Sequence, residues 1–269
     1  MKKRFIFETD QHGNLLFDFQ FELKNSIENS FSPQDFTYGY LRLGTEYLKT
    51  VTSPKIEDWK SLIPIGSVEY VVQFFKSIYN IDLKPINIPD ALWTDEYLGR
   101  RVSLHYKKAV KSYMFGLSGY NKFIKSANLF KDTTEIYRNK DQLTHIQDNL
   151  TGEENQYLVS DVVDIVSEYR VFVHRHEVQD VRRYSGDYKV FPDIQTIDKM
   201  VRELERDKNT PIAYTIDVAV IKEKGRERTV LIEMHDFFSI GLYGFDSYKL
   251  PYMFSQWHYE KLRKEGIEI

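Results

Sequence analysis

The sequence contains no cysteine, which excludes disulfide bonds and thiolate chemistry and fits a reducing compartment. No apolar run approaches the ~18 residues that a membrane-spanning helix requires, so no membrane segment is expected. The formal net charge of the 269 residues is −3, and the chain therefore lacks the overall basic field typical of nucleic-acid-binding proteins. Internal repeats and low-complexity segments are also missing.

The N-terminus does not have the pattern of a secretion signal. It is basic and then briefly apolar, but Glu8 and Asp10 interrupt the apolar stretch before a signal-peptide core is complete. We therefore expect a soluble cytoplasmic protein. Aromatic residues are abundant, with 19 Tyr and 18 Phe, and 42% of all residues are hydrophobic. This composition supports a substantial core for one large domain or two small ones.

The clearest local pattern is a β-hairpin near the C-terminus. Two apolar, β-branched runs, Tyr214–Ile221 and Thr229–Met234, flank a charged segment that contains Gly225. Each run carries one acid, Asp217 in the first and Glu233 in the second. A loop of three or five residues centred on Gly225 places these two carboxylates directly opposite one another.

The paired carboxylates have two interpretations. Like charges that face each other across a strand pair destabilise it, and a cation between them reverses the sign of the effect. Mg²⁺ favours a few carboxylate oxygens together with substrate phosphates, so Asp217 and Glu233 suggest a magnesium site. Amides at these positions would then leave the metal-free protein as stable as before, or slightly more so. The alternative is a hairpin whose acids face water.

The N-terminal third has the pattern of a small α/β unit. Lys3–Phe7 and Leu15–Phe21 are predicted strands around a turn, and a helix is predicted from Ser32 through Tyr47. A further strand feeds a helix for which Ser67 is the predicted N-cap.

Strands and helices continue in the rest of the chain. Helical periodicity covers Ala91–Lys111, and Tyr120–Lys131 is expected to form two short strands. A second hairpin is predicted from Glu168–Val173 and Glu177–Tyr184, followed by an amphipathic helix over Asp193–Asp207. The order of strands, hairpins and helices favours an α+β fold over strict βαβ alternation.

Three cations occupy strand positions where their neighbours are apolar. Lys125 and Lys131 each end a short apolar piece, and Arg170 lies inside the run SEYRVFV. Two interpretations are open for each. The side chain is an exposed strand-end charge or part of an internal salt bridge, or it binds an anion. Together with carboxylates on a late hairpin, they form the set of charges that a nucleotide–metal site needs.

Five segments in order resemble the ATP-grasp fold. They are FIK at Phe123–Lys125, SEYRVFV at Ser167–Val173, RYSGD at Arg183–Asp187, YTIDVAV at Tyr214–Val220 and LIEMHDFFSIGLYG at Leu231–Gly244. The resemblance is to the divergent clade that includes a eukaryotic cell-division-cycle factor assisting translation-initiation complex assembly, and phage and bacterial ATP-grasp domain proteins. It implies two α+β subdomains that sandwich ATP over residues 91–269, after an N-terminal α/β unit of residues 1–90.

The resemblance also implies roles for individual residues. Lys125 and Arg170 match the catalytic lysine and arginine that contact the ATP phosphates, and Lys131 matches a second lysine. Asp217 and Glu233 match the two carboxylates that hold Mg²⁺.

Two further parts of the site follow from the same resemblance. His235 stands where the family has an asparagine metal ligand, and an imidazole nitrogen is a softer ligand than an amide oxygen. This substitution leaves the number and identity of the metals open. The segment YLVSDVV, with Asp161 and Val163, lies where the hinge that binds adenine is expected.

Three functions are compatible with these residues. The first is an ATP- and Mg²⁺-dependent carboxylate–amine ligase that forms an acyl phosphate on a peptide, protein or amino-acid substrate. The second is nucleotidyl transfer with Lys125 as a covalent nucleophile, and the third is a non-catalytic nucleotide-binding or assembly-chaperone module. The nucleotide product distinguishes the first two: ADP for the ligase and AMP with pyrophosphate for the transferase.

Overall fold

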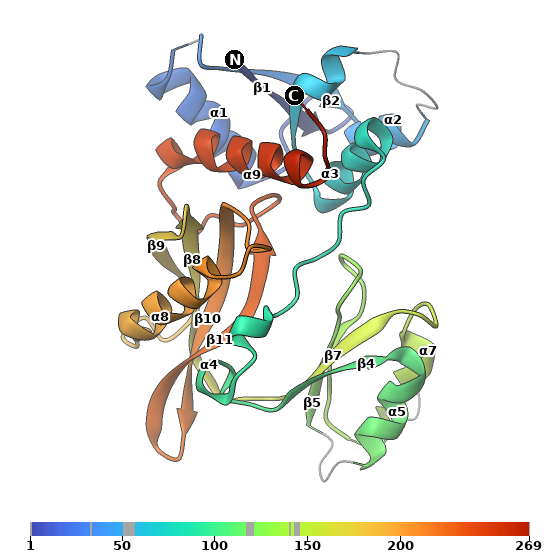
Figure 1. Cartoon of the computed structure of the whole chain (residues 1–269), viewed down its shortest axis with the longest axis vertical. Helices are drawn as coiled ribbons and strands as arrows, with labels where there is room; N and C mark the ends of the chain where they lie inside the picture. Colours follow the sequence, from blue (N-terminus) through green and yellow to red (C-terminus); the bar gives the residue numbers. More distant parts are fainter. Residues whose placement is uncertain are drawn as a thin grey trace.

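Three β-sheets organise the chain in a computed structural model that describes residues 2–32, 34–50, 57–116, 121–139, 141–142 and 146–268. Figure 1 shows an N-terminal unit at the top and two further sheets below it, side by side. The strand orders are β2-β1-β3 in the N-terminal sheet, β4-β7-β5-β6 in the second and β11-β10-β8-β9 in the third. Mixed helix and strand content of this kind confirms the predicted α+β class. Within the described residues, no helix has both the length and the apolar character needed to cross a membrane.

The N-terminal sheet is parallel and has helical crossovers between its strands. Its elements are β1 (Lys3–Thr9), α1 (Asp18–Ser30), β2 (Phe36–Arg42), α2 (Gly44–Thr50), η1 (Glu57–Ser61), β3 (Leu62–Ile65), α3 (Val68–Phe74) and η2 (Phe75–Tyr79). As predicted, a strand feeds a helix at Ser67, whose hydroxyl accepts a hydrogen bond from the backbone N–H of Tyr70.

Two predictions for this unit are wrong. The segment predicted as the strand Leu15–Phe21 instead leads into α1, because Phe19, Leu23 and Ile27 recur at helical spacing and are all buried. The helix predicted to run through Tyr47 is replaced by the strand β2 and the short helix α2. Tertiary packing decides the structure of such short segments, in which the local pattern alone is ambiguous.

The second sheet is antiparallel and carries its helices on one side. The elements from η3 onward are η3 (Asp90–Leu92), α4 (Asp95–Leu98), β4 (Val102–Tyr106), α5 (Lys107–Gly116), β5 (Lys122–Ser126), β6 (Thr134–Tyr137), α7 (Ile146–Asn149) and β7 (Gln156–Asp161). The helix predicted over Ala91–Lys111 is therefore interrupted by β4. Only the first of the two strands predicted within Tyr120–Lys131 forms, as β5, and Tyr120 itself lies outside the described residues.

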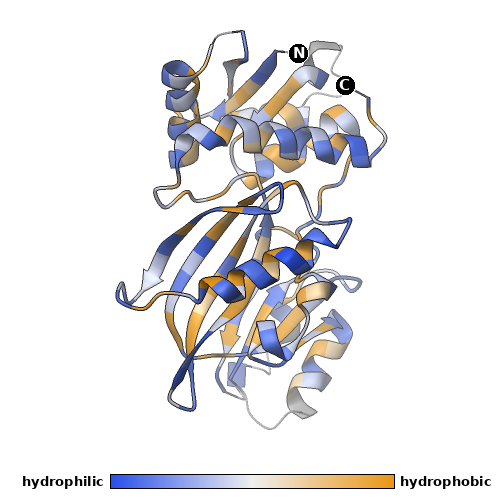
Figure 2. Ribbon diagram, turned by 60° about the vertical axis from the view of Figure 1, so that its left-hand side comes forward, coloured by the Kyte–Doolittle hydropathy of each residue, from blue (hydrophilic) through white to orange (hydrophobic). Residues whose placement is uncertain are grey.

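The third sheet holds the two predicted hairpins, and both are confirmed. Its elements are β8 (Ile165–His174), β9 (Glu177–Gly186), α8 (Ile194–Glu205), β10 (Ala213–Glu223) and β11 (Arg226–Asp236). The amphipathic helix predicted over Asp193–Asp207 forms as α8, and Asp193 caps it by accepting backbone hydrogen bonds from Gln195 and Thr196. Apolar and polar residues alternate around α8 (Figure 2), and Ile197 and Leu204 on its apolar side are fully buried.

The chain ends in η4 (Ser247–Lys249) and α9 (Leu250–Lys264), which return to the N-terminal unit. Phe254 and Trp257 of α9 are buried in the same hydrophobic cluster as Phe5 and Phe75 of that unit. Trp257 also donates a hydrogen bond of 2.6 Å to Asp236 at the end of β11. The division of the chain at residue 90 stays a prediction, and α9 joins the two sides of that boundary.

Candidate functional site

The C-terminal hairpin places Asp217 and Glu233 opposite one another, as the sequence predicts, but by a different route. The turn has two residues, Lys224 and Gly225, and both have positive φ angles, of 50° and 78°. A two-residue turn alone would pair Asp217 with Ile232. A β-bulge beside Asp217 adds one residue to β11 and restores the pairing with Glu233.

Arg100 holds the bulge in place from outside the hairpin. Its guanidinium donates hydrogen bonds of 2.7 Å to the carbonyl of Leu231, 3.3 Å to the carbonyl of Ile232 and 2.9 Å to the carbonyl of Leu98. Burial lowers the pKa of Arg100 to about 10, so the guanidinium stays charged at neutral pH. These hydrogen bonds satisfy two carbonyl oxygens of β11, the edge strand of its sheet, at the bulge.

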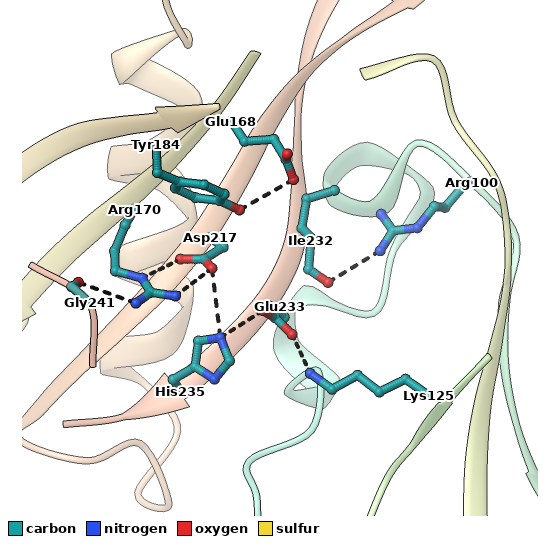
Figure 3. Close-up of polar contacts among 10 residues, drawn as sticks. All are labelled: Arg100, Lys125, Glu168, Arg170, Tyr184, Asp217, Ile232, Glu233, His235 and Gly241. Atoms are coloured by element: carbon teal, nitrogen blue, oxygen red, sulfur yellow. Dashed lines mark hydrogen bonds and ion pairs between the residues drawn. The ribbon is translucent and has the colours of Figure 1, made fainter. Parts of the chain in front are cut away.

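Asp217 is paired with Arg170, its neighbour across β8 and β10. Nε and Nη2 of Arg170 each lie 2.8 Å from a different carboxylate oxygen, and both side chains are buried (Figure 3). Burial opposes ionisation of Asp217, but Arg170 and the nearby His235 hold the pKa of the carboxyl below its usual value. The internal salt bridge that the sequence left as an alternative for Arg170 is thus present.

Glu233 lies between the side chains of Lys125 and His235, which come from different elements. Lys125 of β5 forms an ion pair with Oε2, and Nε2 of His235 lies 2.8 Å from Oε1. Burial raises the pKa of Glu233, but His235 and Lys125 outweigh it and hold that pKa well below its usual value. Burial likewise lowers the pKa of His235, and the carboxylates of Asp217 and Glu233 reverse the shift, so the net change is upward.

A cavity of about 240 Å³ lies between the second and third sheets, beside this cluster. Lys125 and Glu233 both line it, so their ion pair joins the two sheets at its wall. The remaining walls are mostly apolar and come from a connecting segment and from β5, β6, β7, β8 and β11. They are formed by Pro85–Ile88, Arg100, Phe123, Ser126, Ile136, Leu158, Ser160–Val163, Ile165, Glu168, Ile232 and Met234.

Asp161 and Val163 of the predicted adenine hinge also line this cavity. Asp161 ends β7 and forms an ion pair with Lys122, while Val163 follows in the connection to β8. Lys131 does not line it. Its ammonium group lies 2.8 Å from Glu69 of α3, and both side chains are about half exposed.

An aromatic pair covers the other side of Arg170. Tyr243 stacks on Tyr184 with ring centroids 5.1 Å apart, and the guanidinium carbon of Arg170 lies 5.3 Å from the centroid of the Tyr243 ring. Arg170 also donates a 3.3 Å hydrogen bond to the carbonyl of Gly241. The loop after β11 is therefore tied to the guanidinium that pairs with Asp217.

Asp217, Glu233 and His235 have the geometry of a metal-binding group. One ligand atom from each lies within 4.8 Å of the others. Nε2 of His235 is shielded from solvent and is directed at both carboxylates, but it makes no hydrogen bond of regular geometry to any residue that the structure describes. Two carboxylates and an imidazole nitrogen fit a divalent cation.

Sequence reasoning did not assign Arg100, Glu168 or Tyr184 to the site. Glu168 and Tyr184 lie within two of the segments that carry the resemblance, and they contact each other at 3.3 Å. Arg100 follows a glycine in a segment predicted to be helical, so no local signal marked it. Its role depends on a bulge that only the paired strands create.

Comparison with protein families supplies an independent finding. The profile described as ATP-grasp domain, R2K clade family 2, matches residues 97–251, which is more than half of the chain. The chain belongs to this family of ATP-grasp domains. The matched region begins in α4 and ends at the start of α9, so it includes Lys125, Arg170 and the whole hairpin. The predicted membership in a divergent ATP-grasp clade is confirmed.

Solved structures show the same fold over nearly the whole chain. D-alanine–D-alanine ligase from Bacillus anthracis aligns with a TM-score of 0.54 and 9% identity, over 98% of this chain and 100% of that one. A RimK domain ATP-grasp protein from Sphaerobacter thermophilus aligns with a TM-score of 0.56 and 11% identity, over 93% and 95% of the two chains. N5-carboxyaminoimidazole synthetase from Staphylococcus aureus aligns with a TM-score of 0.55 and 8% identity, over 87% of this chain and 71% of that one. A search of curated proteins finds no match.

Proposed function

We propose that this ATP-grasp domain is an ATP- and Mg²⁺-dependent ligase that joins a carboxylate to an amine through an acyl phosphate. One observation carries the proposal. A cation from one sheet, Lys125, meets a carboxylate from the other, Glu233, at the wall of an apolar cavity between the sheets. ATP has an apolar base and a charged tail, so it needs such a cavity with charged groups at one side.

The positions of the cavity and the ion pairs determine how the nucleotide is oriented. The base occupies the cavity, against apolar side chains such as Leu158 and Met234 and beside Asp161 and Val163. The phosphates extend along the contacts that lead from Lys125 and Glu233 to Arg170. Lys131 reaches the phosphates only if its ion pair with Glu69 opens.

The charge of the cluster links metal binding to nucleotide binding. Lys125 and Arg170 already balance the carboxylates of Asp217 and Glu233 in the metal-free protein. A divalent cation added alone would leave two excess positive charges in a partly buried site, where charge is costly. The triphosphate of ATP supplies the matching negative charge. Metal and ATP should therefore each raise the affinity for the other.

The residues of the cluster position and neutralise the reacting groups. A carboxylate oxygen of the acceptor attacks the γ-phosphorus, the bond to ADP breaks, and an acyl phosphate forms. The amine nitrogen then attacks the acyl carbon, phosphate leaves, and the nitrogen loses a proton. Lys125 and Arg170 bind and orient phosphate oxygens. Bound Mg²⁺ offsets the charge of the transferred phosphoryl group. The acceptor is a peptide, a protein or an amino acid.

A non-catalytic nucleotide-binding module is the second candidate, and one observation favours it. Both carboxylates are engaged by protein cations, with Asp217 held by two hydrogen bonds from Arg170. If ATP binding does not displace this pair, the domain holds nucleotide without turning it over.

The experiment is to incubate the protein with ATP and Mg²⁺, with and without cell extract, and to identify the nucleotide product. ADP and phosphate that depend on an acceptor support the ligase. AMP and pyrophosphate support nucleotidyl transfer through Lys125 instead, and bound but unchanged ATP supports the binding module.

A further inference from the structure

The nitrogen Nε2 of His235 lies in an unusual place for a histidine with a merely structural role. It is shielded from solvent and lies 2.8 Å from Glu233 Oε1 and 3.7 Å from Asp217 Oδ2, yet among the described residues it has no partner in a hydrogen bond of regular geometry. Buried polar atoms normally have a partner, so this nitrogen has spare capacity to bind one. Figure 3 shows the ring directed at both carboxylates.

The strand geometry explains why the three groups converge. Glu233 and His235 are two residues apart on β11, so their side chains project from the same face of the sheet. Asp217 faces Glu233 from β10 because of the bulge. All three side chains are therefore fixed by paired β-strands, which hold ligands more rigidly than loops do.

The donor set differs from the one that Mg²⁺ prefers. Mg²⁺ takes oxygen ligands almost exclusively, whereas imidazole nitrogen suits transition-metal dications. We propose that His235 is a direct metal ligand and that it shifts the selectivity of this site from Mg²⁺ towards a first-row transition-metal dication such as Mn²⁺. The inference deepens the proposed function, on which it rests for the role of the metal, but the identity of the ligand is measurable without turnover.

Electron paramagnetic resonance of bound Mn²⁺ tests the ligand directly. The untagged protein is labelled with ¹⁵N only at histidine and mixed with Mn²⁺, with and without a non-hydrolysable ATP analogue of natural isotope content. We expect a ¹⁵N hyperfine coupling from a coordinated imidazole, which nitrogen atoms of the nucleotide do not produce. Bound Mn²⁺ without this coupling, or no bound Mn²⁺ in either sample, overturns the proposal.

Variants connect the coupling to one residue and test the selectivity. His235→Asn should abolish the ¹⁵N coupling and lower the ratio of Mn²⁺ to Mg²⁺ affinity by about tenfold or more, the scale of altered contacts at metal sites. His12→Asn, at an exposed turn, is the matched control and should change neither. An unchanged ratio in His235→Asn contradicts the selectivity. If that variant does not fold, His235→Gln takes its place.

The two proposals fail in distinguishable ways. If Mn²⁺ shows a histidine coupling in a protein that turns over no ATP, His235 is a metal ligand and the ligase proposal is contradicted. If ADP forms and Mn²⁺ is bound only by oxygen atoms, the ligase proposal is supported and the proposal that His235 binds the metal is contradicted.

Discussion

Arg170 and Asp217 form a two-pronged ion pair across β8 and β10, with both nitrogen–oxygen distances equal to 2.8 Å. This pair changes the expected energetics of the hairpin. The sequence alone suggested that repulsion between Asp217 and Glu233 strains the metal-free protein. The structure shows that a separate cation already balances each carboxylate, so the amide variants should not stabilise it.

We expect Asp217→Asn to destabilise the metal-free protein by about 3–5 kcal/mol, because it leaves the buried guanidinium of Arg170 without a counter-charge. The measurement is the free energy of unfolding in urea. A change within about 0.5 kcal/mol would contradict the ion-pair account, since that is the range of ordinary surface substitutions.

The double variant Arg170→Met with Asp217→Leu is the matched control. It replaces the pair by apolar side chains and should be markedly more stable than either single variant, because no buried charge is left unpaired. Additive losses in the double variant would show that the two side chains do not act as a pair.

Glu233→Gln should behave differently from Asp217→Asn. Lys125 and Glu233 each keep about 30% of their side-chain surface exposed, so water screens their pair, and Glu233→Gln should cost clearly less stability than Asp217→Asn. The same change removes a carboxylate from the metal group and should abolish ATP-dependent turnover. The test compares unfolding curves with ADP release, and full ADP release by Glu233→Gln would remove Glu233 from the metal site.

The hairpin shows how far the sequence determines the candidate site. The β-branched runs and Gly225 predict both strands, and the facing pair Asp217 and Glu233 follows from the positions of the acids. The loop length was nevertheless predicted incorrectly, because a bulge beside Asp217 compensates for a shorter turn, and Arg100, which contacts β11 there, is remote in sequence. Contacts between distant segments leave no local pattern.

The N-terminal unit contains a segment whose local sequence pattern predicts the wrong element. The alternating apolar residues of Leu15–Phe21 are typical of a strand, yet the segment enters a helix whose buried face includes Phe19 and Leu23. Over so short a segment, the spacing of apolar residues does not distinguish a helix from a strand. Ser67 was predicted correctly because its capping role needs only its immediate neighbours.

Arg100→Gln should loosen the bulge without removing a group from the cluster itself. Loss of its charge-assisted hydrogen bonds to Leu231 and Ile232 should cost roughly 1.5–3 kcal/mol of stability. Hydrogen exchange of the β11 amides should become faster while exchange in α8 is unchanged. Uniform acceleration throughout the third sheet would contradict a local role for Arg100.

His258 should make the protein less stable in acid. It is fully buried in α9, where burial lowers its pKa from 6.5 to about 3. The unfolded chain therefore takes up the proton first, so stability present above pH 6.5 is lost as the pH falls below it. At pH 5 the loss is about 2 kcal/mol.

The measurement is the free energy of unfolding at pH 7 and pH 5. His258→Phe keeps an aromatic ring against Phe75. Its loss of unfolding free energy between pH 7 and pH 5 should be about 2 kcal/mol smaller than that of the wild type. The exposed His12→Asn should retain the wild-type difference. Identical losses in wild type and His258→Phe would refute the assignment.

Calorimetric titration of ATP in the presence of Mn²⁺ or Mg²⁺ tests the nucleotide site most directly. The comparison is between the wild type, Lys125→Ala at the cavity wall, and Lys108→Ala at an exposed position of α5. We predict that the wild type and Lys108→Ala bind ATP equally, and that Lys125→Ala binds it roughly ten- to a hundredfold more weakly, the loss of one charge-assisted contact. Wild-type affinity in Lys125→Ala, or no binding of ATP by the wild type with either metal, would contradict the proposed site.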